Sequence, residues 1–393
     1  MWSQTYGGAA TENCFSMVQA GDGGFTLVGY TYSFGAGDAD IWFVKTDSNG
    51  NMEWNKTYGA DGYEVARDLL LTDDGYIILG ETTSFGAGEG DVWLIKTNSV
   101  GNMQWNKTYG GIGGDRGWKI IKTSDDGYAI AGITNSYGQG SNDYWLFKID
   151  STGTLQWNMT FGATEDERAR GIIETADNGF LLTGWSSSYG AGGLDYWLVK
   201  TDPDGNHEWN QTYGGTENER AVAIISANDG EYLIVGNTAS FGEGETDFYL
   251  VKTDNAGNMI WNKTYGGAAA ETPFSIINTT DGGYGIAGRT YSYGAGEDDF
   301  WFIKTDSTGT VLINQTYGGQ LSETSHTLIQ TSDGGYAIAG ATASFGQGET
   351  DFWLIKTDEN GIIPEFPAWT TVTSFTITVI AITIIFKKEL QKR

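Results

Sequence analysis

Two sets of positions in this chain carry residue types that bind ligands. The first set mixes aromatic, cationic, aliphatic and imidazole side chains at regular intervals: Phe15, Arg67, Trp118, Arg170, Val222, Phe274 and His326. The second set stands just before a recurring T-x-S motif and varies in the same way: Tyr30, Glu81, Ile133, Trp185, Asn237, Arg289 and Ala341. Aromatic rings and arginines dominate binding hot spots. The candidate ligand-binding residues are therefore Phe15, Tyr30, Arg67, Trp118, Arg170, Trp185, Phe274, Arg289 and His326.

A third set holds an acid in every case, three residues before each member of the first set. Its members are Glu12, Glu64, Asp115, Glu167, Glu219, Glu271 and Glu323. A carboxylate at such a place can accept backbone N–H hydrogen bonds at the corner of a sheet, and we expect this structural role. The alternative is a ring of seven carboxylates that holds a cation in a channel.

The sequence predicts no cofactor. One cysteine, Cys14, excludes an intrachain disulfide, and with only two histidines the chain cannot form a Cys/His metal cluster. The turns "DSNGN" and "DPDGN" are similar to calcium loops, but they lack the glutamate that an EF-hand places at its twelfth position. We expect hairpin turns there, with calcium binding as the weaker alternative.

These positions belong to an internal repeat. Its copies begin at Trp2, Trp54, Trp105, Trp157, Trp209, Trp261 and Ile313, which lie 52, 51, 52, 52, 52 and 52 residues apart. A fixed period of this size indicates one supersecondary unit repeated along the chain.

Each unit contains four short runs of β-forming residues between glycine-rich breakers. In the fifth unit the runs are 209–213, 221–225, 232–236 and 247–253. Tight "DGG" and "DSNG" connections predict antiparallel hairpins, which a propeller blade contains and a parallel solenoid does not. We therefore expect an all-β, seven-bladed β-propeller over residues 1–362, with four antiparallel strands in each blade.

The two ends of the repeat region complement each other. The last block ends at "KTDENG" with no tryptophan strand after it, whereas the chain begins with an unpartnered strand, "MWSQTYGG". We predict that this first strand completes the seventh blade and covers two otherwise exposed sheet edges.

Composition agrees with a turn-rich β protein. The 393 residues include 59 Gly, 4 Pro, 15 Trp, 21 Tyr and 18 Phe, an aromatic content that disordered chains lack. The net charge of −28 argues against nucleic acid as a partner, because phosphate contacts require Lys and Arg. One lysine recurs in each fourth run, and we expect these lysines to form ion pairs within or between blades: Lys45, Lys96, Lys148, Lys200, Lys252, Lys304 and Lys356.

The repeat, most complete as "TSDGGYAIAGATASFGQGETDFWLIKTD" at Thr331–Asp358, resembles that of β-propeller proteins on archaeal and bacterial cell surfaces. This resemblance implies a fold rather than an activity. The run "KTDSNGNMEW" (Lys45–Trp54) is also similar to the tryptophan-docking motif of quinoprotein-type propellers. That similarity implies an outer-strand tryptophan packed on the next blade, without the quinone, because no quinone-binding signature accompanies it.

The C-terminal region differs from the repeats. Residues 368–386 carry no charge and just reach the length of a transmembrane helix, and the basic residues 387–393 predict a cytoplasmic C-terminus. The linker 363–367, "IPEFP", resembles the PEF-type archaeal sorting tail, which implies that a sortase-like enzyme can remove the span. The alternative is a buried C-terminal helix or strand.

This reading places the propeller outside the cell. No signal peptide precedes the first strand given, so either a leader is missing or the chain is tail-anchored with a cytoplasmic propeller. Asn-x-Thr sequons fit the extracellular side, although Asn and Thr also suit an outer strand. The candidate glycosylation sites are Asn55, Asn106, Asn158, Asn210, Asn262, Asn278 and Asn314.

Three functions remain open from the sequence. The leading one is a surface-anchored, monomeric, non-enzymatic binding or adhesion propeller for a glycan, a cell-wall component or a protein. We expect both variable sets to lie on its loop-rich face, which would meet the ligand; the alternative for these sets is neutral drift on a solvated rim. The second is a glycan hydrolase or lyase with its site in the axial funnel, for which His326 is the residue that breaks the repeat. The third is a structural component of a surface coat.

Overall fold

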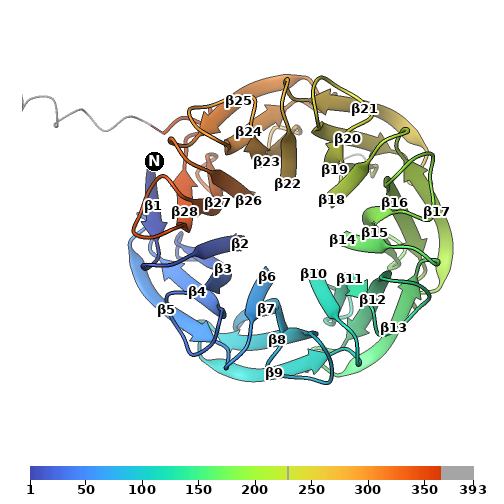
Figure 1. The fold of residues 1–393 in the computed structure, drawn as a ribbon, viewed down its shortest axis with the longest axis horizontal. Helices are drawn as coiled ribbons and strands as arrows, with labels where there is room; N and C mark the ends of the chain where they lie inside the picture. The colour runs from blue at the N-terminus through green and yellow to red at the C-terminus, as the bar shows by residue number, and fades with distance from the viewer. Residues whose placement is uncertain (228–229, 364–393) are drawn as a thin grey trace, which may run out of the picture.

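Seven four-stranded antiparallel sheets stand around a common axis in the computed structural model, which describes residues 1–227 and 230–363 (Figure 1). Each sheet is one blade, with its first strand nearest the axis. This arrangement confirms the all-β, seven-bladed propeller predicted from the 52-residue period.

The strands fall into four concentric layers. The innermost strands are β2 (Glu12–Gln19), β6 (Glu64–Thr72), β10 (Asp115–Lys122), β14 (Glu167–Glu174), β18 (Glu219–Ser226), β22 (Glu271–Asn278) and β26 (Glu323–Gln330). The second strands are β3 (Phe25–Thr31), β7 (Gly75–Thr82), β11 (Tyr128–Thr134), β15 (Phe180–Ser186), β19 (Tyr232–Thr238), β23 (Tyr284–Thr290) and β27 (Tyr336–Thr342). The third strands are β4 (Asp40–Thr46), β8 (Asp91–Asn98), β12 (Asp143–Ile149), β16 (Asp195–Thr201), β20 (Asp247–Thr253), β24 (Asp299–Thr305) and β28 (Asp351–Lys356). The outer strands are β5 (Met52–Tyr58), β9 (Met103–Tyr109), β13 (Leu155–Phe161), β17 (His207–Tyr213), β21 (Met259–Tyr265), β25 (Val311–Tyr317) and β1 (Trp2–Tyr6).

The first strand of the chain closes the ring. β1 pairs antiparallel with β28, with Trp2 opposite Lys356 and Tyr6 opposite Phe352, and so completes the seventh blade (Figure 1). The predicted exchange of the N-terminal strand is confirmed. Its effect is that β28 has hydrogen-bonded neighbours on both sides, β1 and β27.

Every innermost strand contains a β-bulge at its fourth residue. The pairing with the second strand skips that residue, as between Cys14 and Ser16 in β2. The seven skipped residues are Phe15, Arg67, Trp118, Arg170, Val222, Phe274 and His326. A bulge places two consecutive side chains opposite one partner residue and redirects them.

The hydrophobic core lies between blades rather than within them. One cluster joins Val28 and Phe43 of the first blade to Leu69, Ile78 and Trp93 of the second, and six similar clusters join the other neighbours. The second and third strands are buried on both faces, so they form almost continuous apolar runs. Neighbouring blades therefore stabilise one another through buried apolar area.

An outer-strand side chain, tryptophan in six of the seven cases, seals each blade to the next. A Cβ at Gly257, in the turn after β20, would lie 2.7 Å from Cζ3 of Trp209 in the preceding blade, and Tyr213 Oη donates a hydrogen bond of 2.6 Å to the Gly257 carbonyl. The same docking recurs around the ring: Trp2 on Gly50, Trp54 on Gly101, Trp105 on Gly153, Trp157 on Gly205, Trp261 on Gly309 and Ile313 on Gly361. The packing implied by the tryptophan-docking resemblance is present.

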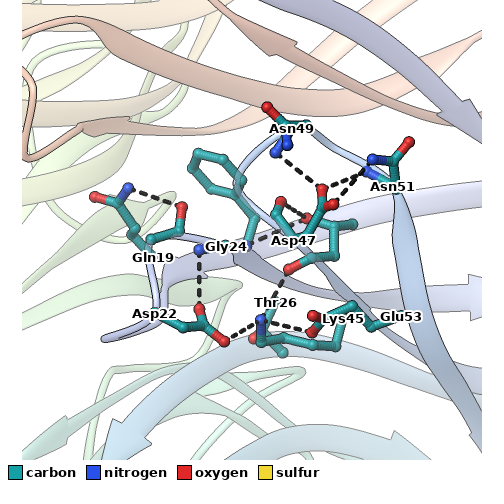
Figure 2. A network of polar contacts seen from close by, with 12 residues as sticks. Gln19, Asp22, Gly24, Thr26, Lys45, Asp47, Asn49, Asn51 and Glu53 are labelled. Carbon is teal, nitrogen blue, oxygen red and sulfur yellow. Dashed lines mark hydrogen bonds and ion pairs between the residues drawn. The ribbon is translucent and has the colours of Figure 1, made fainter.

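The recurring lysines lie at the same end of each blade as the docking turns. Lys45 Nζ on β4 lies 2.7 Å from Asp22 in the turn before β3 and 3.1 Å from Glu53 on β5 (Figure 2). The pairing is therefore within a blade. Beside it, Asp47 accepts hydrogen bonds from the backbone N–H groups of Asn49 and Asn51, which makes the "DSNGN" segment a capped hairpin turn (Figure 2).

The predicted membrane span at 368–386 lies outside the described residues. Within residues 1–227 and 230–363, no helix is long and apolar enough to cross a bilayer.

Replacing a docking glycine tests the seal between blades. Both Gly257 and Gly334 have a positive φ, +79° and +87°, but a Cβ at Gly334 meets nothing within 4 Å. We expect Gly334→Ala to lower the free energy of unfolding by about 1–2 kcal/mol through backbone strain alone. Gly257→Ala should lower the free energy of unfolding by about 1–3 kcal/mol more than Gly334→Ala does, because its methyl group overlaps Trp209. Urea unfolding measures both; equal losses would contradict the role of the docking contact.

Candidate functional site

The bulge residues converge on the axis of the ring. They line a cavity of about 670 Å³ enclosed by the innermost strands. Eight of the nine predicted binding residues line it: Phe15, Arg67, Trp118, Arg170, Trp185, Phe274, Arg289 and His326. The ninth, Tyr30, does not line it but packs on Phe15 with ring centroids 5.9 Å apart.

Bulge residues of neighbouring blades stack on one another. The rings of Phe274 and Phe15 each lie 4.7 Å from the ring of His326. The guanidinium of Arg67 lies 4.9 Å from the Phe15 ring and 4.6 Å from the Trp118 ring.

The stack continues from Trp118 to Arg170, whose guanidinium lies 3.5 Å from the Trp118 ring. Val222 comes next and interrupts the stack, because valine has neither a ring nor a charge and is the smallest side chain of the set. The cavity lies against β18 at this interruption, and Arg220, Val222, Ala223, Ile224 and Ile225 of that strand line it.

The second variable set lies inside the ring and not on a solvated rim. Glu81, Ile133, Trp185, Asn237 and Ala341 are buried. Their register explains why they are buried. Each pairs with the second residue of an innermost strand, two residues before the bulge. Most of this set is therefore packed inside the ring, so free drift of solvated surface residues does not explain its variation.

The charge around the cavity is opposite to that of the whole chain. All arginines of the described residues lie on innermost strands or on the strand beside one: Arg67, Arg116, Arg168, Arg170, Arg220 and Arg289. Two carboxylates near the cavity are already paired. Asp68 accepts from Lys119 Nζ at 3.0 Å, and Glu81 accepts from Arg67 at 2.7 Å.

Arg170 differs from Arg67 in its partners. Within the described part of the chain, no carboxylate lies within ion-pair distance of its guanidinium, and its Nε is buried without a hydrogen-bond acceptor. Trp118 covers it at 3.5 Å and Trp185 at 4.9 Å. Burial, followed by the charges of Arg67, Arg168 and Arg116, lowers the pKa of Arg170 to about 9, so the group stays cationic at neutral pH.

His326 is held as a neutral imidazole. Burial, with smaller effects from Arg289 and Arg67, lowers its pKa to about 3. Its Nε2 is buried without a hydrogen-bond partner. A base with so low a pKa is poorly matched to proton transfer near neutral pH.

The recurrent acids lie away from the cavity, at the corner where each blade begins. Glu12 is fully buried, and it accepts hydrogen bonds from Gly8 N (2.7 Å), Ser33 N (3.1 Å) and Thr31 Oγ1 (2.7 Å). Glu64, Asp115, Glu167, Glu219, Glu271 and Glu323 occupy the equivalent corners and are also fully buried. Among the residues described, no cluster of three or more His, Cys, Asp or Glu is arranged to hold a metal ion.

A second carboxylate meets each of these acids across the blade boundary. A Cβ at Gly266 would lie 1.4 Å from Asp247 Oδ1 and 2.6 Å from Glu271 Oε2, so only glycine fits between them. Burial, followed by the charges of Glu271 and Glu243, raises the pKa of Asp247 to about 6. The pKa of Asp143 is also raised to about 6, by burial and by the charge of Glu167.

The sequon asparagines are exposed on the molecular surface. Those on outer strands also have a structural contact, since Trp42 Nε1 donates to Asn55 Oδ1 at 3.3 Å and Trp301 Nε1 to Asn314 Oδ1 at 2.7 Å. Asn106, Asn158 and Asn210 accept the same bond.

Sequence reasoning missed the residues that follow the bulges. Ser16, Asp68, Lys119 and Thr327 also line the cavity, next to the predicted positions. Simple alternation along a strand would turn these side chains away from the axis. The available signal was that this position also differs between repeats, unlike the acid three residues before the bulge.

Comparison with known proteins supports the fold alone. No family model matches the chain. The WD40 domain of Neurospora crassa Pan2 is similar over 90% of this chain and 92% of that one, with a TM-score of 0.51 and 11% identity. A puromycin hydrolase is similar over 91% of this chain and 55% of its own, with a TM-score of 0.54 and 12% identity.

The molecule is a seven-bladed β-propeller. In sequence, this propeller is 27% identical to part of the regulatory protein FlaEY of Caulobacter vibrioides, over 46% of this chain and 21% of FlaEY. The chain thus matches about a fifth of the length of that curated relative.

The shifted carboxyl groups predict a stability maximum in mild acid. The pKa values of Asp143 and Asp247 are raised to about 6, so protonation favours the folded chain and stability should rise as the pH falls from about 7 to about 4. Lysine partners and hydrogen bonds lower the pKa of Asp125 and Asp281 to about 2, so stability should fall again between about pH 4 and pH 2.

Thermal unfolding against pH measures this profile. Asp247→Asn should flatten the rise between pH 7 and pH 4 and leave the acid limb in place. Asp281→Asn should leave the rise between pH 7 and pH 4 in place and reduce the loss of stability between pH 4 and pH 2. If Asp247→Asn left the pH profile unchanged, Asp247 would not be a source of the rise in stability.

Proposed function

We propose that this chain is a non-enzymatic binding propeller that takes its ligand in the central cavity. One observation carries the proposal: the blades differ in residue type at the bulges, and these side chains meet in a single cavity. A repeat that served only as a coat would have no reason to gather its differences at one place. The ligand classes are a glycan, a cell-wall component or a segment of another protein.

The cavity suits a ligand of limited size. Its volume of about 670 Å³ lies within the range of small-molecule sites, and it combines aromatic walls with a few polar groups. The valine of β18 leaves the space that aromatic or arginine side chains fill at most other bulges. A sugar unit or a short chain end would enter there.

Catalysis is the less favoured alternative. A glycosidase needs two free carboxyl groups beside the bond that it cleaves. Here Asp68 accepts hydrogen bonds from Ser16 Oγ and Ile120 N besides its ion pair with Lys119, and Glu81 also lies 3.1 Å from Arg116. The depressed pKa of His326 argues against its use as a general base.

Filling the gap at Val222 tests this proposal. Phenylalanine occupies the same backbone position at Phe15 and Phe274, so Val222→Phe should fold normally. We expect it to weaken binding about tenfold or more by occupying the cavity, whereas Val222→Ala should keep the affinity. A glycan array, with peptides as a second panel, identifies the ligand for the full chain. Unchanged binding by Val222→Phe would place the site elsewhere.

The proposal includes display on the cell surface. The predicted C-terminal span and the exposed sequons support an extracellular propeller, monomeric and attached to the membrane or released by a sortase-like enzyme. Protease treatment of intact cells that make the protein should then remove the propeller, and its peptides should carry glycans at some of the sequon asparagines. A propeller that resists protease until the cells are lysed would contradict surface display.

A further inference from the structure

Positive charge is concentrated at the axis of a strongly acidic protein. The cavity is lined by Arg67, Lys119, Arg170, Arg220 and Arg289 and by the carboxylate of Asp68. Glu81 lies 2.7 Å from Arg67 and Asp298 lies 3.8 Å from Arg289, so cations still outnumber the described carboxylates there. The whole chain has a net charge of −28. Such a local reversal of sign within low-dielectric walls focuses an attractive potential for anions.

Arg170 is the group best prepared to receive an anion. Its guanidinium lies over two indole rings, 3.5 Å from the centre of Trp118 and 4.9 Å from the centre of Trp185, and these contacts restrict its position. Stacking leaves the N–H groups at the edge of the guanidinium plane, where a carboxylate can accept two parallel hydrogen bonds. Because no carboxylate of the described residues lies within ion-pair distance of this group, those donors are available to a ligand.

Arg67 provides an internal comparison. It is stacked in the same way, between Phe15 and Trp118, but its Nη2 lies 2.7 Å from Glu81 Oε1. Arg67 therefore has an acid partner of its own, and within the described residues Arg170 has none.

The other polar groups of the cavity are mostly neutral. Asn237, Thr272, Ser275 and Thr327 line it together with the apolar ring of Phe274. Amide and hydroxyl groups match the hydroxyls of a sugar, and an aromatic ring matches the apolar face of a pyranose. The combination fits one sugar that carries one carboxylate.

We propose that the cavity binds a uronic acid residue, and that Arg170 pairs with its carboxylate. This inference rests on the proposed binding function and names its ligand class. The overall charge of −28 favours a single uronate or a chain end over a long polyanion, which the acidic exterior would repel. A short acidic peptide is the competing ligand, and it is an outcome of the test below.

The test uses the full chain labelled with ¹⁵N in its tryptophan indoles. Glucuronate, galacturonate and mannuronate are titrated separately, and glucose, galactose and mannose serve as neutral controls. We expect at least one uronate to shift the indole signals of Trp118 and Trp185, which Trp→Phe variants assign. The neutral sugars should produce smaller shifts at the same concentration.

Three variants assign the role of Arg170. Arg170→Met should weaken uronate binding by about 10- to 100-fold, the usual effect of losing hydrogen bonds to a charged group. Arg170→Lys should be intermediate, because it keeps the charge but loses the planar fork. Arg168→Lys is the matched control on the same strand. Arg168 does not line the cavity and its Nε lies 2.8 Å from Asp166, so a change that keeps its charge should leave binding unchanged.

Each other outcome would overturn the inference. Equal shifts with acetate, phosphate or sulfate would indicate an anion site without sugar recognition, and tighter binding of a diglutamyl peptide would indicate a peptide site. No shift with any uronate, or full binding by Arg170→Met, would exclude the pairing. If a neutral glycan bound, and Val222→Phe blocked it while Arg170→Met did not, the proposed function would stand and this inference alone would fail.

Discussion

The contact on which the structure depends is the docking of an outer-strand ring on a glycine of the next blade. Trp209 over Gly257, with Tyr213 bonded to the same glycine carbonyl, joins two sheets that share no ladder hydrogen bonds at that place. Repeated around the axis, this contact sets the position of each blade relative to its neighbour and buries the apolar faces between them. A closed ring then holds the innermost strands at fixed positions about the axis, and the geometry of the cavity follows from that.

A repeat tends to make seven equal surfaces, yet this protein has one distinctive cavity. The β-bulge resolves the contradiction, because it turns the fourth residue of each innermost strand toward the axis, where no packing constraint shared by all blades acts on it. The scaffold positions stay alike, as the buried acids Glu12 and Glu271 do at the blade corners. The bulge positions can differ, and arginine, tryptophan, phenylalanine, histidine and valine meet there.

Most of the fold was predictable from the sequence, because period, turn residues and the unpaired strand at 2–6 depend on local chemistry. The candidate residues were also largely predictable, since Arg170 and Trp118 stand out against their counterparts in other repeats. That these side chains point toward the axis of the ring could not be predicted from the sequence. Alternation places Asp68 and Lys119 on the wrong side unless a bulge is known, and the free space beside Val222 depends on how Arg170 and Phe274 stack across blades. No local sequence pattern predicts how side chains pack between strands that lie about 52 residues apart in the chain.

The pairing of β1 with β28 also determines how the ring would respond to mechanical load. β28 lies between β1 and β27, and the described structure continues beyond it to residue 363. A pull applied along β28 would load two hydrogen-bonded ladders together, those with β1 and with β27. An edge strand in the same place would peel away one bond at a time. The exchanged first strand thus makes β28 part of a shear clamp.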